Sequence, residues 1–119
     1  GYLYPRTGVL VGPMAIEMVR SVHANKAIMA CAGLTADGLF NANVLMAEVQ
    51  RAMMGCADEV ILVVDHSKFG RQALARIAEL SQVDRLVSDS GLEECWRGLL
   101  RDAGLALIIA PVESEDGPA

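Results

Sequence analysis

Five consecutive β-forming residues, Val60 to Val64, constrain the fold of this chain more than any other feature. A short run of aliphatic residues without alternation is typical of a strand that is covered on both faces, as in the middle of a parallel sheet. The run ends at the polar segment Asp65-His66-Ser67-Lys68. We therefore expect a central buried strand with a polar loop at its carboxyl end.

The segments on either side of this run alternate between helical and strand patterns. Helices are predicted from Pro13 to Val22, from about Val44 to Ala57, and from a capping box at Ser90 and Glu93 to Ala103, with Gly104 as a left-handed cap. Further strands are predicted at Lys26–Ala32, Arg85–Ser88 and Leu105–Ala110. This order predicts an α/β fold with an open, mostly parallel sheet and helices on its faces.

Two segments are harder to interpret. Residues 33–43 contain an Asp-Gly pair and two asparagines, so we expect a loop there. Residues 74–80 alternate like a strand but also fit a helical turn, and both interpretations stay open.

Length and charge restrict the class of protein. A chain of 119 residues forms one domain, which we place at 1–112, followed by a flexible acidic tail at 113–119. The net charge of −5, with scattered basic residues, argues against contact with a nucleic acid backbone. Because the chain opens at Gly1 without an initiator Met or a helix start, we interpret it as a fragment of a longer protein.

The sequence also predicts the cellular compartment. Its longest apolar stretches are shorter than the roughly 20 residues of a membrane helix, and no signal peptide is recognisable. Cys31, Cys56 and Cys95 lie on apolar stretches without a CxxC pair, which fits buried thiols in a reducing cytoplasm. We expect neither a disulfide nor a metal site, and no cofactor.

Ligands of open α/β sheets bind beyond the carboxyl ends of the strands. Two segments should meet there, 33–43 and 65–70. Lys68 could hold a phosphate or carboxylate as a point charge, or it could simply be solvated. Asp65, His66 and Ser67 do not predict a hydrolytic triad, because consecutive residues leaving a strand point to alternate sides. A carboxylate such as Asp65 commonly accepts hydrogen bonds from its own loop.

Other candidates in this region have structural alternatives. Asn41 and Asn43 could bind sugar hydroxyls, although such asparagines more often shape turns. Gly33 allows close approach of a ligand or a tight turn of the chain. Glu48 could pair with Arg51 on a helix surface or face the crevice. His23 and His66 are isolated from each other and from acidic clusters, so a metal site is not expected.

Several of these residues together resemble a known family. The segment 63–71, Val-Val-Asp-His-Ser-Lys-Phe-Gly-Arg, followed by Val83-Asp84-Arg85-Leu86-Val87-Ser88-Asp89, resembles the late signature of the sensor domain of DeoR-type bacterial regulators. The upstream Gly12-Pro13, Lys26-Ala27, Asn43 and Glu48-Val49-Gln50-Arg51 follow the same pattern in the same order. The resemblance covers about residues 1–111.

The resemblance implies a function as well as a fold. It implies part of a domain related to ribose-5-phosphate isomerase and the CoA-transferases, which senses a sugar phosphate and thereby relieves repression of a carbohydrate operon. DNA would be contacted only by a helix-turn-helix module outside this chain, and self-association would accompany that role. In this family Lys68 matches a motif lysine, while Asn43, Glu48 and Gly33 carry over as weaker ligand-binding candidates.

Three departures from the family pattern limit this interpretation. Ala32 stands where enzymes of the fold keep a catalytic carboxylate, and Gln50 stands where a lysine is common. The first half of the sensor, with its phosphate-binding loop, is missing, so this chain could hold only part of the binding site.

We predict a sensor domain rather than an enzyme. An isomerase or deaminase acting on a phosphosugar and an oligomerisation domain stay as alternatives.

Overall fold

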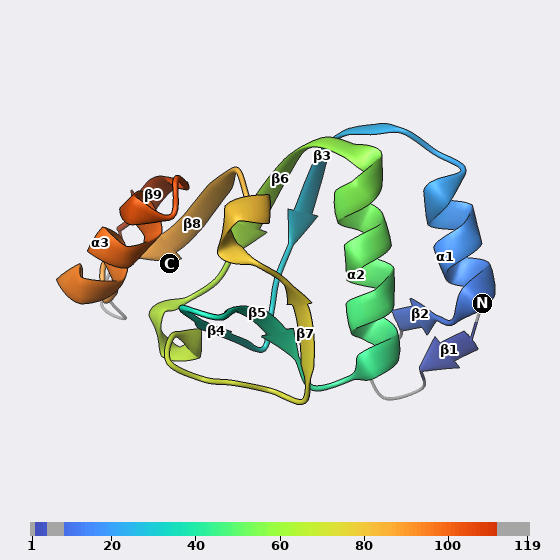
Figure 1. Cartoon of the computed structure of the whole chain (residues 1–119), viewed down its shortest axis with the longest axis horizontal. Coiled ribbons are helices and arrows are strands. Elements are labelled where there is room, and N and C mark those ends of the chain that lie inside the picture. The colour runs from blue at the N-terminus through green and yellow to red at the C-terminus, as the bar shows by residue number, and fades with distance from the viewer. Residues whose placement is uncertain (1, 5–8, 112–119) are drawn as a thin grey trace, which may run out of the picture.

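A computed structural model describes residues 2–4 and 9–111 of the chain (Figure 1). Three α-helices and nine strands lie in these ranges, with two short 3-10 helices, η1 and η2. The elements are β1 (Tyr2–Tyr4), β2 (Val9–Val11), α1 (Pro13–Arg20), β3 (Ala24–Met29), β4 (Gly33–Thr35), β5 (Gly38–Asn41), α2 (Val44–Cys56), β6 (Ala57–Val63), η1 (His66–Lys68), β7 (Ala75–Ala78), η2 (Leu80–Gln82), β8 (Arg85–Asp89), α3 (Glu94–Asp102) and β9 (Ala106–Ala110).

Four strands form one parallel sheet in the order β3-β6-β8-β9. Ile28 pairs with Ile61, and Val63 pairs with Val87, so β6 has a hydrogen-bonded neighbour on each side. This confirms the predicted α/β fold, the parallel sheet and the central position of the Val60–Val64 run.

A smaller antiparallel sheet, β4-β5-β7, corrects the predicted loop at 33–43. Thr35 pairs with Gly38 across Ala36 and Asp37, and Gly38 takes a φ of 133°. The Asp-Gly pair is therefore part of a hairpin turn, whose strands bury Leu39 and Phe40. The segment that stayed open, 74–80, contributes strand β7 and the start of η2.

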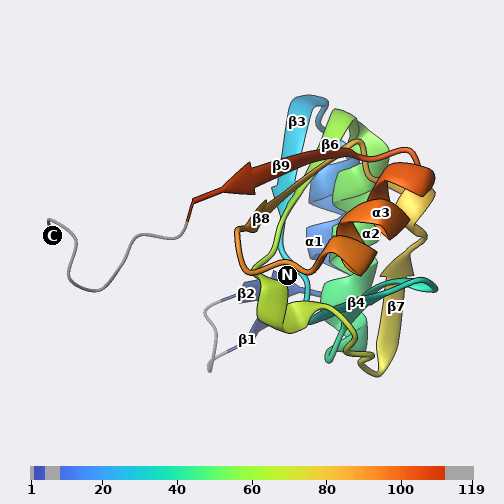
Figure 2. The ribbon, with the colours of Figure 1, turned by 90° about the vertical axis from the view of Figure 1, so that its left-hand side faces the viewer.

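The core lies on one face of the parallel sheet. In Figure 2 the helices α2 and α3 and the small sheet stand on that side. Six large side chains there are fully buried and interlock the layers: Leu34, Leu39, Leu62, Ile77, Leu86 and Leu100. The opposite face carries Val63, which is 47% exposed. The expectation that the central strand is covered on both faces is thus wrong for the part of the chain that the structure describes.

The boundaries of several elements differ from their prediction. Strand β3 ends at Met29 rather than Ala32, because Ala32 donates from its amide to the Phe40 carbonyl oxygen of the hairpin (2.9 Å). Helix α3 begins at Glu94, with no side-chain cap from Glu93, so the predicted capping box is wrong. Gly104, with a φ of 91°, ends this helix as predicted, and the following amide bonds back to Leu100 (3.1 Å).

The cysteines do not share one environment. Cys31 is buried as expected, but Cys56 is half-buried and Cys95 is exposed. Cys95 lies on α3 beside Glu93, with the thiol 3.8 Å from the carboxylate. The general prediction of buried thiols is therefore wrong for Cys95.

Leu62 is central to the stability of this architecture, because it is fully buried in the middle strand. We expect Leu62→Ala to reduce the free energy of unfolding by about 2–5 kcal/mol through lost burial and an unfilled cavity. Leu74→Ala is the matched control, since Leu74 is 80% exposed. Urea denaturation of both variants checks this; equal midpoints for the two would contradict the described core.

Candidate functional site

The carboxyl ends of β3, β6 and β8 open on one edge of the parallel sheet, because the three strands run in the same direction. Polar side chains that follow β6 and β8 gather at this edge. We call Asp65, His66, Ser67, Lys68 and Asp89 the strand-end cluster.

Asp65 shapes the loop that leaves β6. Its carboxylate caps η1 by accepting the Ser67 amide (2.9 Å) and also the Ser67 hydroxyl. These hydrogen bonds from Ser67 lower the pKa of Asp65 below its ordinary value. Because Ser67 donates to Asp65 and not to His66, the three residues do not form a hydrolytic triad, as expected.

His66 joins this loop to the end of β8. Its Nδ1 lies 2.9 Å and 3.0 Å from the two carboxylate oxygens of Asp89. The hydrogen bond raises the pKa of His66 and lowers the pKa of Asp89. A Cβ on Gly91 would lie 2.7 Å from the His66 ring, so a larger residue at this position would force the ring to move.

Each histidine of the chain pairs with one carboxylate, since His23 also contacts Asp58 (3.1 Å). A single carboxylate beside each histidine is a pair and does not form an acidic ligand cluster. Among residues 2–4 and 9–111, no group of three or more His, Cys, Asp or Glu side chains could hold a metal ion.

Lys68 lies between the ends of β3 and β6. Burial raises the pKa of the Cys31 thiol to about 11, against the opposing effects of the Gly33 amide and the Lys68 charge. Lys68 also helps to lower the pKa of Asp65. The ammonium is thus close enough to act on both groups, although the ion pairs of residues 12–111 do not include it.

The residue after Lys68 anchors the loop. The Phe69 ring packs on Trp96 of α3 with centroids 5.5 Å apart, and Phe69 also bridges to Leu34 of β4. The Gly70 amide donates to the Leu34 carbonyl oxygen (2.8 Å). The two segments that we expected to meet at the strand ends therefore do meet, and their contacts restrict where Lys68 can reach.

Gly33 is buried where β4 packs against the segment after Gly70. A Cβ at Gly33 would lie 2.2 Å from the Arg71 carbonyl oxygen. The contact that requires glycine here is with the protein's own backbone. This contact accounts for Gly33 without a ligand.

Asn43 begins α2 and is engaged by the backbone. Its side chain accepts the Met46 amide (3.1 Å), while its own amide donates to the Asn41 side chain (3.0 Å). Asn41 donates to Gln50 (2.9 Å), and the buried Gln50 donates to the Ala30 carbonyl oxygen (2.7 Å). Asn43 therefore caps the start of α2, and Asn41 connects this helix to the end of β3 through Gln50.

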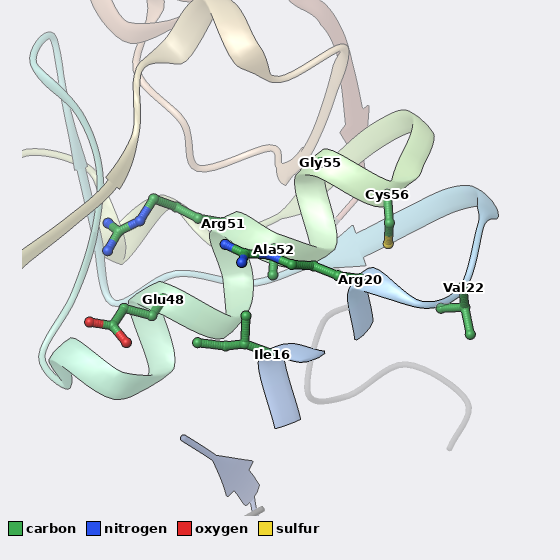
Figure 3. A pocket seen from close by; sticks show the side chains of 8 residues that line it. All are labelled: Ile16, Arg20, Val22, Glu48, Arg51, Ala52, Gly55 and Cys56. Carbon is green, nitrogen blue, oxygen red and sulfur yellow. The ribbon is translucent and has the colours of Figure 1, made fainter. Parts of the chain in front are cut away.

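Glu48 lies apart from the strand-end cluster. It lines a groove of about 720 Å³ between α1 and α2 together with Arg20, Arg51 and Cys56 (Figure 3). Arg51 donates to the Arg76 carbonyl oxygen (2.5 Å) rather than pairing with Glu48, which was one of the two alternatives for this helix surface. Glu48 lines this groove, while its carboxylate points away from Arg20 in Figure 3, and its role in ligand binding stays a prediction.

Sequence reasoning missed Arg20 as a groove residue. Its position in the last turn of α1 is visible in the sequence, but its proximity to α2 depends on the packing of the two helices.

None of the described helices is long and apolar enough to cross a membrane.

Comparison with known proteins identifies the family. A model described as the DeoR C terminal sensor domain matches residues 1–90. The chain belongs to this sensor-domain family. The resemblance that the sequence motifs indicated is thereby confirmed.

The relatives of this sensor domain are transcriptional regulators rather than enzymes. The uncharacterized regulator YulB of Bacillus subtilis is 30% identical over 94% of this chain and 44% of its own length. The repressor GlcR of the same organism is 32% identical over 91% of this chain and 41% of its length. The glycerol-3-phosphate regulon repressor of Escherichia coli is 31% identical over 76% of this chain and 36% of its own length. The chain thus spans less than half the length of these relatives.

The contact at Gly33 predicts the effect of a small substitution. We expect Gly33→Ala to lower the free energy of unfolding by more than about 1 kcal/mol, because backbone must shift to admit the methyl group. Gly98→Ala is the matched control: a Cβ there has open space within α3, so stability should rise by about 0.5–1 kcal/mol. Chemical denaturation distinguishes the two, and equal effects would refute the close packing.

The His66–Asp89 pair predicts a dependence on pH. The contribution of His66 to the stability of the folded state is complete below the ordinary pKa of 6.5 and is lost as pH rises through the raised pKa of His66. The contribution through Asp89 is present above 3.8 and is lost as pH falls through the lowered pKa. We therefore expect the Tm difference between the native chain and His66→Gln to be largest between about pH 3.8 and pH 6.5.

An NMR titration of the His66 imidazole checks the cause. Asp89→Asn should lower its pKa toward the ordinary value, whereas Asp58→Asn, which changes the partner of His23, should leave it unchanged. A His66 pKa that does not respond to Asp89→Asn would show that the pair is not formed.

Proposed function

We propose that this chain is the effector-binding part of a DeoR-type transcriptional repressor, and that its effector is a sugar phosphate held at the strand-end cluster. Membership of the sensor family and the position of Lys68 carry this proposal. A half-buried lysine at the carboxyl edge of a parallel sheet suits a phosphate group. The repressor role is in keeping with the names of two relatives, the repressor GlcR and the glycerol-3-phosphate regulon repressor, and the second name also contains a phosphorylated metabolite.

In this proposal Lys68 binds the phosphate, and the loop held by Phe69 sets its position. His66, when protonated, adds a second positive charge at the same edge, while Asp89 keeps its ring oriented. Asn43 and Gly33 position the elements around the site through their contacts with Met46 and Arg71. Glu48 would contact only a ligand that extends toward the α1–α2 groove.

The site supports binding rather than catalysis. General acid-base catalysis needs a proton-transferring group at the reacting carbon. Ala32 supplies none at the position where enzymes of the related fold keep a carboxylate. Asp65 already accepts from Ser67, and Asp89 is engaged by His66 and by the Gly91 amide. A ligand here would change the balance between two states of the regulator through its different affinity for each.

The wider role follows from charge and surface. With a net charge of −5, this part would leave DNA to a helix-turn-helix module elsewhere in the regulator, acting in the cytoplasm. Self-association is supported by the exposed apolar side chains of Met14 and Met18 on α1. Residues 1–112 would form the sensor part. The acidic tail proposed at 113–119 lies outside the described residues.

The role of Lys68 is tested by effector binding to the full-length regulator. A panel of sugar phosphates, each beside its unphosphorylated sugar, is screened by thermal shift. A ligand at about 100 times its Kd should stabilise the native state by about 2.7 kcal/mol. We expect Lys68→Met to weaken binding about 10- to 100-fold, because a charged hydrogen bond contributes about 1.5–3 kcal/mol.

Lys26→Met is the matched control, since Lys26 is the other lysine of the chain and lies near the opposite end of β3. It should leave the affinity unchanged. Stabilisation by no sugar phosphate would refute the proposed effector class. Equal losses in the two variants would instead refute the specific role of Lys68.

A further inference from the structure

Strand β9 forms one edge of the parallel sheet, because the strand order is β3-β6-β8-β9. Its pairing with β8 continues from Ala106 to Ala110 without a bulge. Among the described residues, no strand pairs with the other side of β9. That side therefore presents a row of backbone N–H and C=O groups to its surroundings. We call this side the β9 edge.

The β9 edge lacks the features that usually prevent exposed strands from associating. Proteins protect such edges with charged side chains, proline, bulges or very short strands. Residues 105–110 are Leu-Ala-Leu-Ile-Ile-Ala, and proline follows only at position 111. The opposite edge of the sheet differs, since β3 carries the exposed Asn25 and Lys26. An apolar, unprotected edge is typical of a strand that pairs with another strand.

The backbone direction of β9 identifies the groups that point outward. The Ala106 amide donates to the Asp84 carbonyl oxygen just before β8 (3.0 Å). Because the N–H and C=O groups of successive residues point to opposite sides of a strand, Ala106 and Ile108 bond to β8. Leu107 and Ile109 then direct their N–H and C=O groups to the β9 edge. The side chains of these two residues pack on the core, which holds the edge in place.

The limits of this row fit an antiparallel copy of the same strand. In a two-fold arrangement centred on Ile108, Leu107 of one copy lies opposite Ile109 of the other, and the two exchange both hydrogen bonds. The next pair outward is Leu105 with Pro111. Neither has a free N–H, because the Leu105 amide already donates to a carbonyl oxygen of α3 (3.1 Å) and proline has no amide hydrogen. The ladder therefore ends on both sides where the donors of β9 end.

A second copy of this chain is favoured over an unrelated strand, because the β9 edge is self-complementary. Two-fold symmetry is the commonest arrangement of oligomers, and it places the same surface on both sides of the interface. Ile108, which is 43% exposed, then lies opposite its own symmetry mate at a non-hydrogen-bonded position, where side chains come closest. An apolar side chain is stabilised by contact with its own copy, whereas a charged one would be repelled.

We propose that two copies of the regulator pair through the β9 edge, antiparallel and centred on Ile108, and so join their parallel sheets into one continuous sheet. This surface is distinct from α1 with its exposed Met14 and Met18, since β9 and α1 lie at opposite ends of the molecule in Figure 1. The inference goes beyond the proposed sensing function and does not depend on the identity of the effector.

Ile108→Cys tests the register in the full-length regulator. Non-hydrogen-bonded partners have Cα atoms about 4.5 Å apart, which a disulfide can span. With a mild oxidant we expect a disulfide between residues 108 of two copies, distinguished by peptide mass spectrometry from the native Cys31, Cys56 and Cys95. Ala106→Cys is the matched control, because it lies on the same face of β9 but roughly 13 Å from its symmetry mate, and it should cross-link at least about tenfold less. Equal cross-linking of the two variants, or none with Ile108→Cys, would overturn the proposal.

Ile109→Pro tests the hydrogen bonds of the β9 edge. It removes an N–H that points outward, which a free edge tolerates and a paired edge does not. Ile109→Ala is the matched control, because it also shortens the side chain but keeps the N–H. We expect the subunit dissociation constant of the full-length regulator, measured by sedimentation, to be at least about tenfold higher for Ile109→Pro than for Ile109→Ala. Equal constants, or a native regulator that sediments as a monomer, would refute the pairing, and the cross-linking decides the question if the proline variant does not fold.

Discussion

Strand β6 pairs in parallel with β3 on one side and β8 on the other, and the positions of the remaining elements depend on this pairing. Because the three strands share one direction, the segments that follow them must leave from the same edge. The hairpin β4-β5 and the loop at Asp65–Gly70 are thereby brought into contact, although a complete helix, α2, separates them in the sequence. The polar cluster at this edge is a consequence of strand direction before it is a consequence of any single side chain.

The parts of the fold that could be predicted are those with a strong local period. The run at Val60–Val64, the apolar stripe of α2 and the Gly104 cap each appear in the structure close to their predicted places. The hairpin was missed because polar turn residues occupy most of a short segment, and only the pairing partner decides whether its flanks are strands. Residues 74–80 were ambiguous for the same reason, since β7 is defined by its hydrogen bonds to β5.

The candidate site was predictable to a smaller extent. The position of Lys68 at a strand end follows from the local pattern, and its ligand stays a prediction. Gly33 and Asn43 were recognisable as unusual positions, but the partners that explain them, Arg71 and Met46, could be found only from the structure. The position of Glu48 beside the α1–α2 groove depends on helix packing, which no spacing within α2 reveals.

The strand-end cluster and the face of the parallel sheet opposite the core share the same two strands. Val63 is exposed on that face, Val64 is buried in the core, and Asp65 belongs to the cluster, so three consecutive residues lie on three different surfaces. The same holds for Val87 and Asp89 on β8, with the buried Ser88 between them. A ligand shifts a conformational equilibrium only by contacting the two states differently. An effector held at the ends of β6 and β8 would therefore act on the same backbone that carries the core and the exposed face of the sheet.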